Sequence, residues 1–176
     1  MSSKPLDILK PRRSPKDRRK NYIIVIQKQI QQYIKNGCQG DLDLSGTPID
    51  KLPENLKKVG GKLDLSDTNI YEFPPHIKVN GSIYLTDTPI KSLPNNLQVY
   101  GDLDISFTHI TRLPDNLTVH GGLFASNSAL SVFPPKNLKV YNSVDLDNTL
   151  FSMKTEMTEH EIKSLADIRG DIFMSI

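Results

Sequence analysis

A segment of about twenty residues is repeated along the middle of the chain, between residues 40 and 151. Two adjacent copies, GSIYLTDTPIKSLPNNLQVY and GDLDISFTHITRLPDNLTVH, show the pattern. Each copy contains two apolar residues separated by one other residue, and these pairs are Leu42/Leu44, Leu63/Leu65, Ile83/Leu85, Leu103/Ile105, Leu123/Ala125 and Val144/Leu146. The pairs follow one another at steps of 21, 20, 20, 20 and 21 residues. A fixed period of this length predicts a solenoid in which each copy forms one coil.

The alternation within each apolar pair predicts a short strand, with the pair facing inward and the residue between them facing outward. One strand per copy predicts a parallel sheet along one face of the solenoid. A hydroxyl residue follows every pair at the same register, at Thr47, Thr68, Thr88, Thr108, Ser128 and Thr149. We expect these hydroxyls to be buried and to bond the backbone of their own coil and of the next.

A proline recurs later in the copies, at Pro53, Pro74, Pro94, Pro114 and Pro134. Proline lacks an amide hydrogen and disfavours helical geometry in the residue before it. The returning side of each coil is therefore predicted to be extended or polyproline-like rather than helical.

The pattern L-x-L-x-x-T-x-I-x-x-L-P-x-N-L resembles the leucine-rich repeat in its short bacterial form, and it covers about two thirds of the chain. It departs from the family in carrying Thr or Ser where Asn is usual. This variant, DLSGTPI followed by LPxNL, is similar to repeats encoded by tailed bacteriophages. The resemblance implies a concave parallel sheet and a phage protein made in the host cytoplasm. Type III effector ubiquitin ligases share the short repeat, but the chain has neither the length nor the motif of their catalytic domain.

Two segments precede the repeats. Residues 1–13 are polar and rich in Pro, Lys and Arg, and they are predicted to form a basic flexible arm. Residues 14–39 are predicted to form an N-terminal capping helix that starts at Ser14 and Pro15 and stops at Asn36 and Gly37. Its apolar stripe consists of Tyr22, Ile23, Ile26, Ile30, Tyr33 and Ile34. This stripe is expected to cover the open end of the array, and a partner-binding helix is the alternative.

The period stops after Phe151, and residues 152–176 are predicted to form a C-terminal cap. Thr158 and Glu161 form the sequence pattern of a capping box, and Gly170 is the expected stop of a short helix. The apolar stripe of this helix is Ile162, Leu165 and Ile168. The final apolar residues are Ile172, Phe173, Met174 and Ile176. They are predicted to pack beneath the helix, with a self-associating tail as the alternative.

The outward residues of the strands are the candidate binding surface, because solenoids bind along their sheet. The candidate protein-binding residues are Asp43, Asp64, Tyr84, Asp104, Phe107, Phe124 and Asp145. This surface is acidic and contains aromatic residues, and exposed aromatics commonly anchor protein interfaces. We therefore expect a protein partner that presents Lys or Arg. The alternative for each aspartate is a solvent-facing residue suited to a turn.

Charge is distributed unevenly along the chain. Residues 1–40 carry a net charge of +8, whereas residues 41–151 carry −4. The basic run offers a candidate nucleic-acid site formed by Arg12, Arg13, Arg18, Arg19 and Lys20. No aromatic residue interleaves with these charges, which weighs against nucleic-acid recognition. A further hypothesis is that the arm binds the acidic face of its own chain or of another copy.

No set of residues indicates catalysis, a cofactor or a metal. The D-x-D pairs follow from the repeat's own alternation, without further ligands nearby. The four histidines lie at unrelated repeat positions or outside the repeats, at His76, His109, His120 and His160. The Gly60-Gly61 and Gly121-Gly122 pairs are turn residues rather than a phosphate-binding loop.

We therefore expect a non-enzymatic protein-binding module that binds and modulates a host protein through its concave face. A virion accessory component and a nucleic-acid-associated protein are the alternatives. The longest apolar run, Tyr22 to Ile26, has five residues, so no membrane span is expected. The single cysteine, Cys38, favours a reducing compartment, the cytoplasm. The sequence leaves the oligomeric state open.

Overall fold

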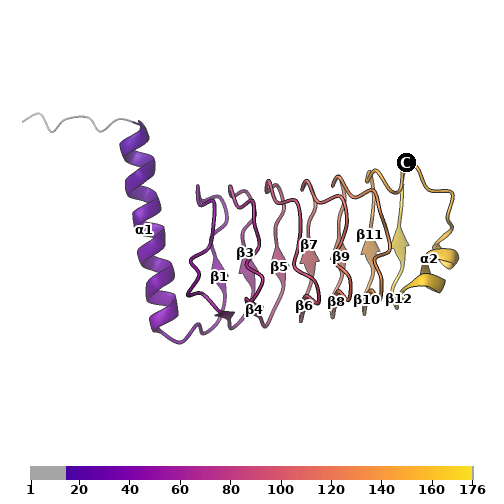
Figure 1. The fold of residues 1–176 in the computed structure, drawn as a ribbon, viewed down its shortest axis with the longest axis horizontal. Helices are drawn as coiled ribbons and strands as arrows, with labels where there is room; N and C mark the ends of the chain where they lie inside the picture. The colour runs from indigo at the N-terminus through magenta and orange to yellow at the C-terminus, as the bar shows by residue number, and fades with distance from the viewer. Residues whose placement is uncertain (1–14, 176) are drawn as a thin grey trace, which may run out of the picture.

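The computed structural model describes residues 15–175, which form a parallel β-solenoid whose coils are about twenty residues long (Figure 1). One strand from each coil enters a 7-stranded parallel sheet. Its strands, in spatial order, are β1 (Leu42–Asp43), β3 (Leu63–Asp64), β5 (Ile83–Tyr84), β7 (Leu103–Asp104), β9 (Leu123–Phe124), β11 (Val144–Asp145) and β13 (Ile172–Phe173). We call the outward surface of this sheet, formed by the second residue of each strand and the two residues that follow each apolar pair, the sheet face. The predicted solenoid and its predicted parallel sheet are confirmed.

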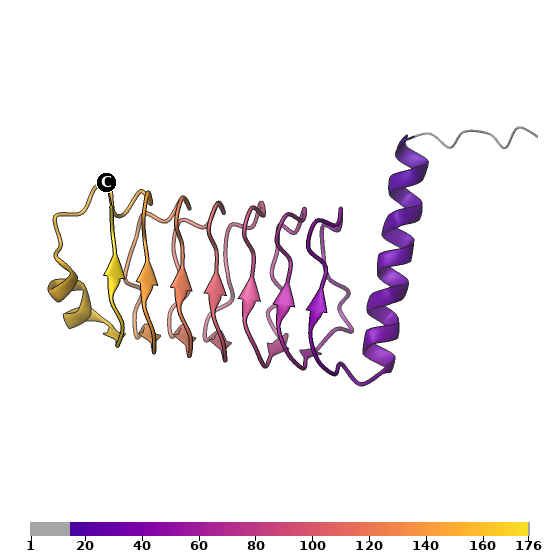
Figure 2. The same cartoon turned by 180° about the vertical axis from the view of Figure 1, so that it is seen from behind.

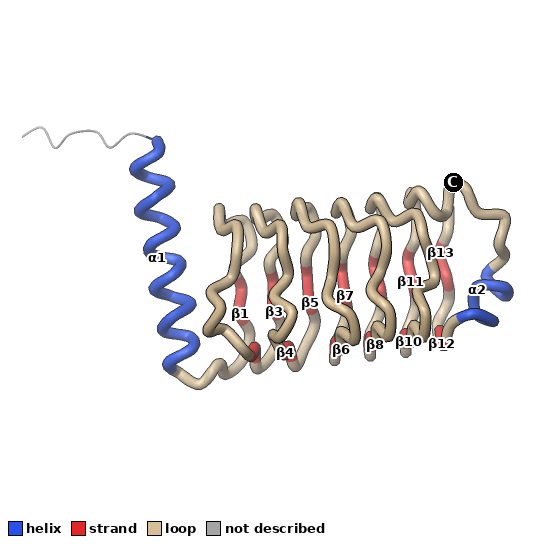
Figure 3. The backbone as a smooth tube through the Cα atoms, viewed as in Figure 1, coloured by secondary structure: helices blue, strands red, loops and turns tan. Residues whose placement is uncertain are grey.

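A second short strand per coil lies along the lower edge of the array (Figure 3). These strands are β2 (Lys58–Val59), β4 (Lys78–Val79), β6 (Gln98–Val99), β8 (Thr118–Val119), β10 (Lys139–Val140) and β12 (Asp167–Ile168). The sequence predicts one strand per copy and misses these, although alternating buried residues such as Ile77/Val79 and Leu97/Val99 mark most of them. No helix lies between residues 40 and 151, as the recurrent prolines predict.

The buried hydroxyl at the turn bonds the coil to which it belongs. Thr68 Oγ1 donates to the carbonyl oxygen of Leu65 at 2.7 Å, and the same bond recurs at Thr47, Thr88, Thr108 and Thr149. The expected bond to the next coil is not formed by these hydroxyl groups. The reason is that backbone groups already pair between coils, as where the Leu65 amide donates to the Tyr84 carbonyl at 2.9 Å.

The helix α1 (Pro15–Lys35) stands beside the first coil and extends past it at its N-terminal end (Figure 2). Ile26 and Ile30 are buried against the array. The Tyr33 hydroxyl donates to the Gly40 carbonyl at 2.9 Å and accepts from the Gly60 amide at 3.1 Å. Tyr22 was predicted to belong to the buried stripe, but it is exposed.

The sheet continues past Phe151, where the fixed period of the sequence stops. After the short helix α2 (Glu159–Leu165), β12 pairs with β10 and β13 pairs with β11. Ile172 pairs with Val144 and is buried, whereas Phe173 faces outward. The predicted helix stop at Gly170 is wrong, because α2 ends at Leu165 and Ile168 lies on β12. Ile162 and Ile168 are buried, but Leu165, predicted to belong to the same stripe, is 60% exposed. The last residues therefore extend the sheet, and the Ile172 amide also donates to Glu159 Oε1 of α2 at 3.3 Å.

Candidate protein-binding face

Carboxylates and aromatic rings alternate among the second residues of the strands, which lie along the middle of the sheet face. From β3 to β13 the second residues of successive strands are Asp64, Tyr84, Asp104, Phe124, Asp145 and Phe173, and each is paired with the next. Parallel strands lie about 4.8 Å apart, so one carboxylate follows another at about 9.6 Å along the sheet, and one aromatic ring follows another at the same distance. Asp43, on β1, stands outside the alternation because its neighbour is Asp64.

Phe173 completes this pattern and was missing from the sequence prediction. Its side chain is 52% exposed, beside Asp145 on the neighbouring strand. The signal that could have revealed it is the spacing of Ile172 and Met174, which reproduces the apolar pair of the repeats. This signal lies 28 residues after Val144 rather than 20 or 21.

Each aspartate that is the second residue of a strand holds the backbone of its own strand end. Oδ1 of Asp43, Asp64, Asp104 and Asp145 accepts a hydrogen bond from the amide two residues later, at distances of 2.9 to 3.1 Å. The Ser45 hydroxyl also donates to Asp43, and these two bonds lower the pKa of the Asp43 carboxyl, with a smaller contribution from the charge of Lys62. The turn-stabilising role that was the alternative for the aspartates is therefore present.

That role uses one oxygen of each carboxylate and leaves the other available. Among the residues that the structure describes, Oδ2 of Asp104 and Oδ2 of Asp145 make neither a hydrogen bond nor an ion pair. A carboxylate can accept at both oxygens, so each of these groups keeps its charge and one oxygen for a partner.

Lys62 supplies a cation to one end of the sheet face. Its Nζ lies 3.9 Å from Asp64 Oδ2 and 5.7 Å from the centroid of the Tyr84 ring. The ammonium group thus contacts a carboxylate and an aromatic face together, a geometry that stabilises a cation. It also offsets the repulsion between the neighbouring carboxylates of Asp43 and Asp64.

Phe107 has a backbone conformation that is unusual for its residue type. Its φ is 57°, in the left-handed region, and its side chain is 56% exposed. The other coils have Gly46, Asp67, Asp87, Asn127 and Asn148 at this register, also with positive φ. Glycine, Asn and Asp tolerate that conformation, whereas a bulky side chain is strained in it. Strain retained at an exposed aromatic residue marks a candidate functional position.

Phe124, one coil further along, has its ring seated over a glycine. A Cβ atom on Gly122 would lie 2.9 Å from Cζ of the Phe124 ring, so only glycine leaves room for this ring position. The ring is 38% exposed. Phe107 and Phe124 belong to neighbouring coils, because the Phe107 amide donates to the Ser126 carbonyl at 3.1 Å. The two exposed phenylalanines among the predicted site residues thus lie on neighbouring coils.

A stack of side chains at the lower edge of the array was missed by sequence reasoning. His120 lies between Tyr100 and Tyr141, with ring centroids 5.3 and 5.0 Å apart, and the Arg169 guanidinium lies 4.1 Å from the Tyr141 centroid. The position of His120 is unrelated to those of the other histidines, as predicted, but it is equivalent to the positions of two tyrosines. Alignment on the valines Val99, Val119 and Val140 would have revealed the stack, since each ring follows one of them.

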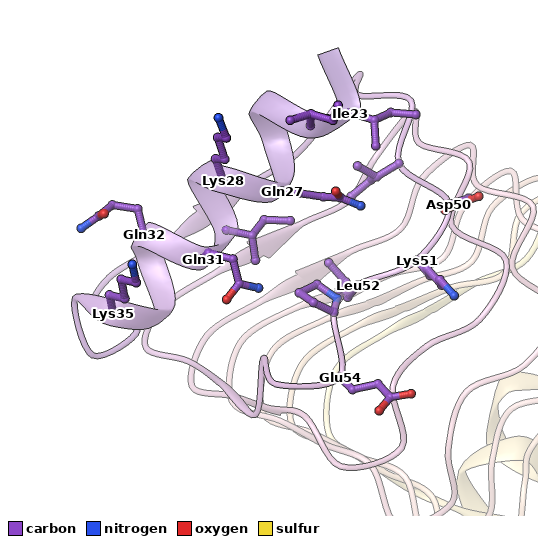
Figure 4. A pocket seen from close by; sticks show the side chains of 14 residues that line it. Ile23, Gln27, Lys28, Gln31, Gln32, Lys35, Asp50, Lys51, Leu52 and Glu54 are labelled. Carbon is purple, nitrogen blue, oxygen red and sulfur yellow. The ribbon is translucent and has the colours of Figure 1, made fainter. Parts of the chain in front are cut away.

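A crevice of about 750 Å³ lies between α1 and the first coil (Figure 4). Its walls combine apolar side chains such as Ile23 and Leu52 with charged ones such as Lys28, Lys51 and Glu54, which point in different directions. It contains none of the predicted site residues. Within residues 15–175, no group of three or more His, Cys, Asp or Glu side chains converges on a metal-binding position.

The basic residues predicted to bind nucleic acid are placed only in part. Arg18, Arg19 and Lys20 belong to the first turns of α1, and their side chains are not described. Arg12 and Arg13 lie outside the described residues. Their role stays a prediction. In the described part of the chain, no helix has the length and apolar character needed to cross a membrane.

No family model matches the chain, and no curated protein or solved structure matches it. The class of the protein is therefore defined by its geometry: a parallel β-solenoid with coils of about twenty residues. Its best-formed candidate site is the sheet face, where carboxylates and aromatic rings alternate.

Proposed function

We propose that the chain is a non-enzymatic protein-binding module whose partner binds the sheet face. The observation that carries this proposal is Phe107, a bulky residue kept exposed in a strained left-handed conformation where the five coils from β1 to β11 other than its own have Gly, Asp or Asn. Folding alone favours the residues of the other coils. Contact with a partner explains why phenylalanine occupies this position.

The surroundings of Phe107 support a protein partner rather than a small ligand. Phe124 and Phe173 are also exposed on the same face, and large exposed aromatics anchor protein interfaces. The available carboxylate oxygens of Asp104 and Asp145 favour a partner that presents Lys or Arg. The residues 41–151 carry a net charge of −4, which favours the same kind of partner.

The finer classification is part of the proposal. We infer that the coils are leucine-rich repeats of the short bacterial and phage type, from the recurrent L-x-L and L-P segments. Burial of Ile26 and Ile30 supports α1 as a cap on the first coil. By the likeness to phage repeats, the partner is a protein of the host cell, in its cytoplasm. A virion accessory component is the alternative, and stoichiometric presence in purified particles would identify it.

The experiment is capture of partners from bacterial lysate with the full chain as bait. The test variant combines Phe107→Asn with Phe124→Asp, which installs residues that other coils carry and preserves the fold. The matched control combines Tyr71→Ser with Val132→Thr, two exposed apolar residues outside the sheet face. We expect the test variant to lose the captured protein and the control to retain it, at equal thermal stability. Equal capture by all three proteins would refute the proposal.

A further inference from the structure

We propose that the segment bound by the sheet face is a basic polyproline II segment with Lys or Arg at every third residue. This inference rests on the proposed function and names the chemistry of its partner. Three features of the sheet face support it: the repeat distance of the alternating groups, the contact of Lys62 with two of them, and the negative charge of the face.

The spacing of the carboxylates matches one turn of polyproline II helix. Asp64, Asp104 and Asp145 lie on every second strand, and Tyr84, Phe124 and Phe173 lie on the strands between them and beyond. Two strand spacings measure about 9.6 Å. A polyproline II helix has three residues per turn and rises about 9.3 Å per turn. A cation at every third residue would therefore meet one carboxylate per turn.

Other backbone conformations fit this spacing less well. Over four strand spacings, about 19.2 Å, two turns of polyproline II advance about 18.6 Å. Four turns of α-helix advance about 21.6 Å, so an α-helix drifts by more than 2 Å over the same length. In an extended strand, side chains on the same face are about 6.8 Å apart. If one cation of such a strand met a carboxylate, the next side chain on that face would fall short of the next carboxylate, which is about 9.6 Å away.

Lys62 shows in the folded chain the contact that the partner would supply. Its ammonium group is close both to the Asp64 carboxylate and to the face of the Tyr84 ring. Among the ion pairs of the described residues, none involves Asp104 or Asp145. These two carboxylates and the rings of Phe124 and Phe173 repeat the same arrangement without a cation. The residues between the cations of a polyproline II segment lie nearest the rings, where proline packs well on aromatic side chains.

A second copy of the same face is a poor occupant, because it would bring carboxylates against carboxylates. Residues 1–13 are a more serious competitor, since Lys10-Pro11-Arg12-Arg13 places two cations three residues apart. Occupation by this segment, from the same chain or from another copy, is an outcome that the experiment below separates from a partner protein.

The experiment titrates a fluorescent peptide, Arg-Pro-Pro-Arg-Pro-Pro-Arg, into the full chain. The matched peptide, Arg-Arg-Arg-Pro-Pro-Pro-Pro, has the same composition and charge without the three-residue spacing. We expect the spaced peptide to bind at least about tenfold more tightly, as the loss of one charge-assisted contact implies. Equal affinities would leave only nonspecific attraction of charge and would overturn the inference.

Two substitutions locate the peptide on the face. Asp104→Asn and Asp145→Asn keep an oxygen that accepts from the backbone amide two residues later, while they remove the negative charge. Each should weaken binding of the spaced peptide by about tenfold. Asp43→Asn is the matched control, because Asp43 makes the same backbone bond outside the alternation. An effect of Asp43→Asn as large as the others, or no effect of any of the three, would contradict the inference.

Deletion of residues 1–13 distinguishes the occupants. Unchanged peptide affinity supports a partner segment, whereas a gain of tenfold or more would show that the deleted residues already occupy the face and would overturn the inference.

The proposed function can fail separately. If capture from lysate depends on Phe107 and Phe124 but the spaced peptide does not bind, the proposed function stands and the polyproline II segment is wrong. If neither depends on the sheet face, both are wrong.

Discussion

The Nζ atom of Lys62 lies 5.7 Å from the centroid of the Tyr84 ring, on the neighbouring strand of the sheet. The same ammonium group lies 3.9 Å from the Asp64 carboxylate. The first carboxylate and the first ring of the alternation are thus already in contact with a cation of the chain itself. A basic partner competes with Lys62 at this end of the face and meets no such competitor at the other.

We predict that Lys62→Gln strengthens binding of the three-arginine spaced peptide by about threefold to fivefold, which corresponds to one exposed cation–aromatic contact. The substitution frees Asp64 and Tyr84 for the peptide. Titration at fixed ionic strength measures the change. Lys91→Gln removes the same charge from an exposed position outside the sheet face, so it controls for net charge. Equal gains in both variants would mean that net charge alone is responsible.

We predict that Phe107 contributes to partner binding but lowers the stability of the folded chain. Phe107→Asn places in the left-handed position a residue that tolerates it, so the free energy of unfolding should rise by about 1 kcal/mol. Chemical denaturation measures this change. The reverse substitution at the same register, Asn127→Phe, should lower stability by a similar amount. A Phe107→Asn protein that is no more stable than the parent would show that phenylalanine is not strained there.

Much of the fold is predictable from sequence because each coil repeats the same solution. The apolar pairs and the turn threonines recur at a fixed step, and their burial follows from strand alternation. The last coil escapes prediction for a physical reason. The helix α2 lengthens the step from Val144 to Ile172, and the final segment lacks the threonine and proline that mark the other copies.

The candidate site is predictable only as a set of outward residues. Asp104 and Phe124 are identified from alternation within their own copies, and alignment of the copies places them in a two-strand period. The extension of that period to Phe173 depends on the pairing of β13, which the sequence does not predict. The hydrogen bonds of the aspartates also depend on backbone geometry after the strand, which a pattern of residue types does not specify. The strain at Phe107 is likewise a property of its φ, not of its sequence neighbours.

A ladder of asparagines should stabilise the return side. Asn116 has a φ of 59°, donates to Asn96 at 2.9 Å and accepts from Asn137 at 2.8 Å. Asn116→Ala should lower the free energy of unfolding by about 2 kcal/mol, because it loses both bonds and strains the backbone. Asn116→Gly keeps the left-handed conformation and should lose about half as much. Urea denaturation compares the two, and equal losses would remove the argument from backbone conformation.

The contact of Tyr33 with the first coil should make stability depend on alkaline pH. Burial is the main cause that raises the pKa of the Tyr33 hydroxyl above its ordinary value of 10.0. The folded state therefore favours the neutral phenol more than the unfolded state does. The resulting stabilisation is complete below pH 10.0 and is lost as the pH rises above that value.

Tyr33→Phe tests this linkage. At pH 7 the variant should lose about 1–2 kcal/mol of stability, because its ring cannot form the bonds to Gly40 and Gly60. Urea unfolding from pH 7 to pH 11 should show that the difference between parent and variant narrows above pH 10.0, where the parent loses the contribution of the neutral hydroxyl. Tyr22→Phe, on the same helix but exposed, should match the parent throughout. A difference that stays constant across this range would show that ionisation of Tyr33 is not coupled to folding, and the helix would then be held by Ile26 and Ile30 without a contribution from the phenol's charge state.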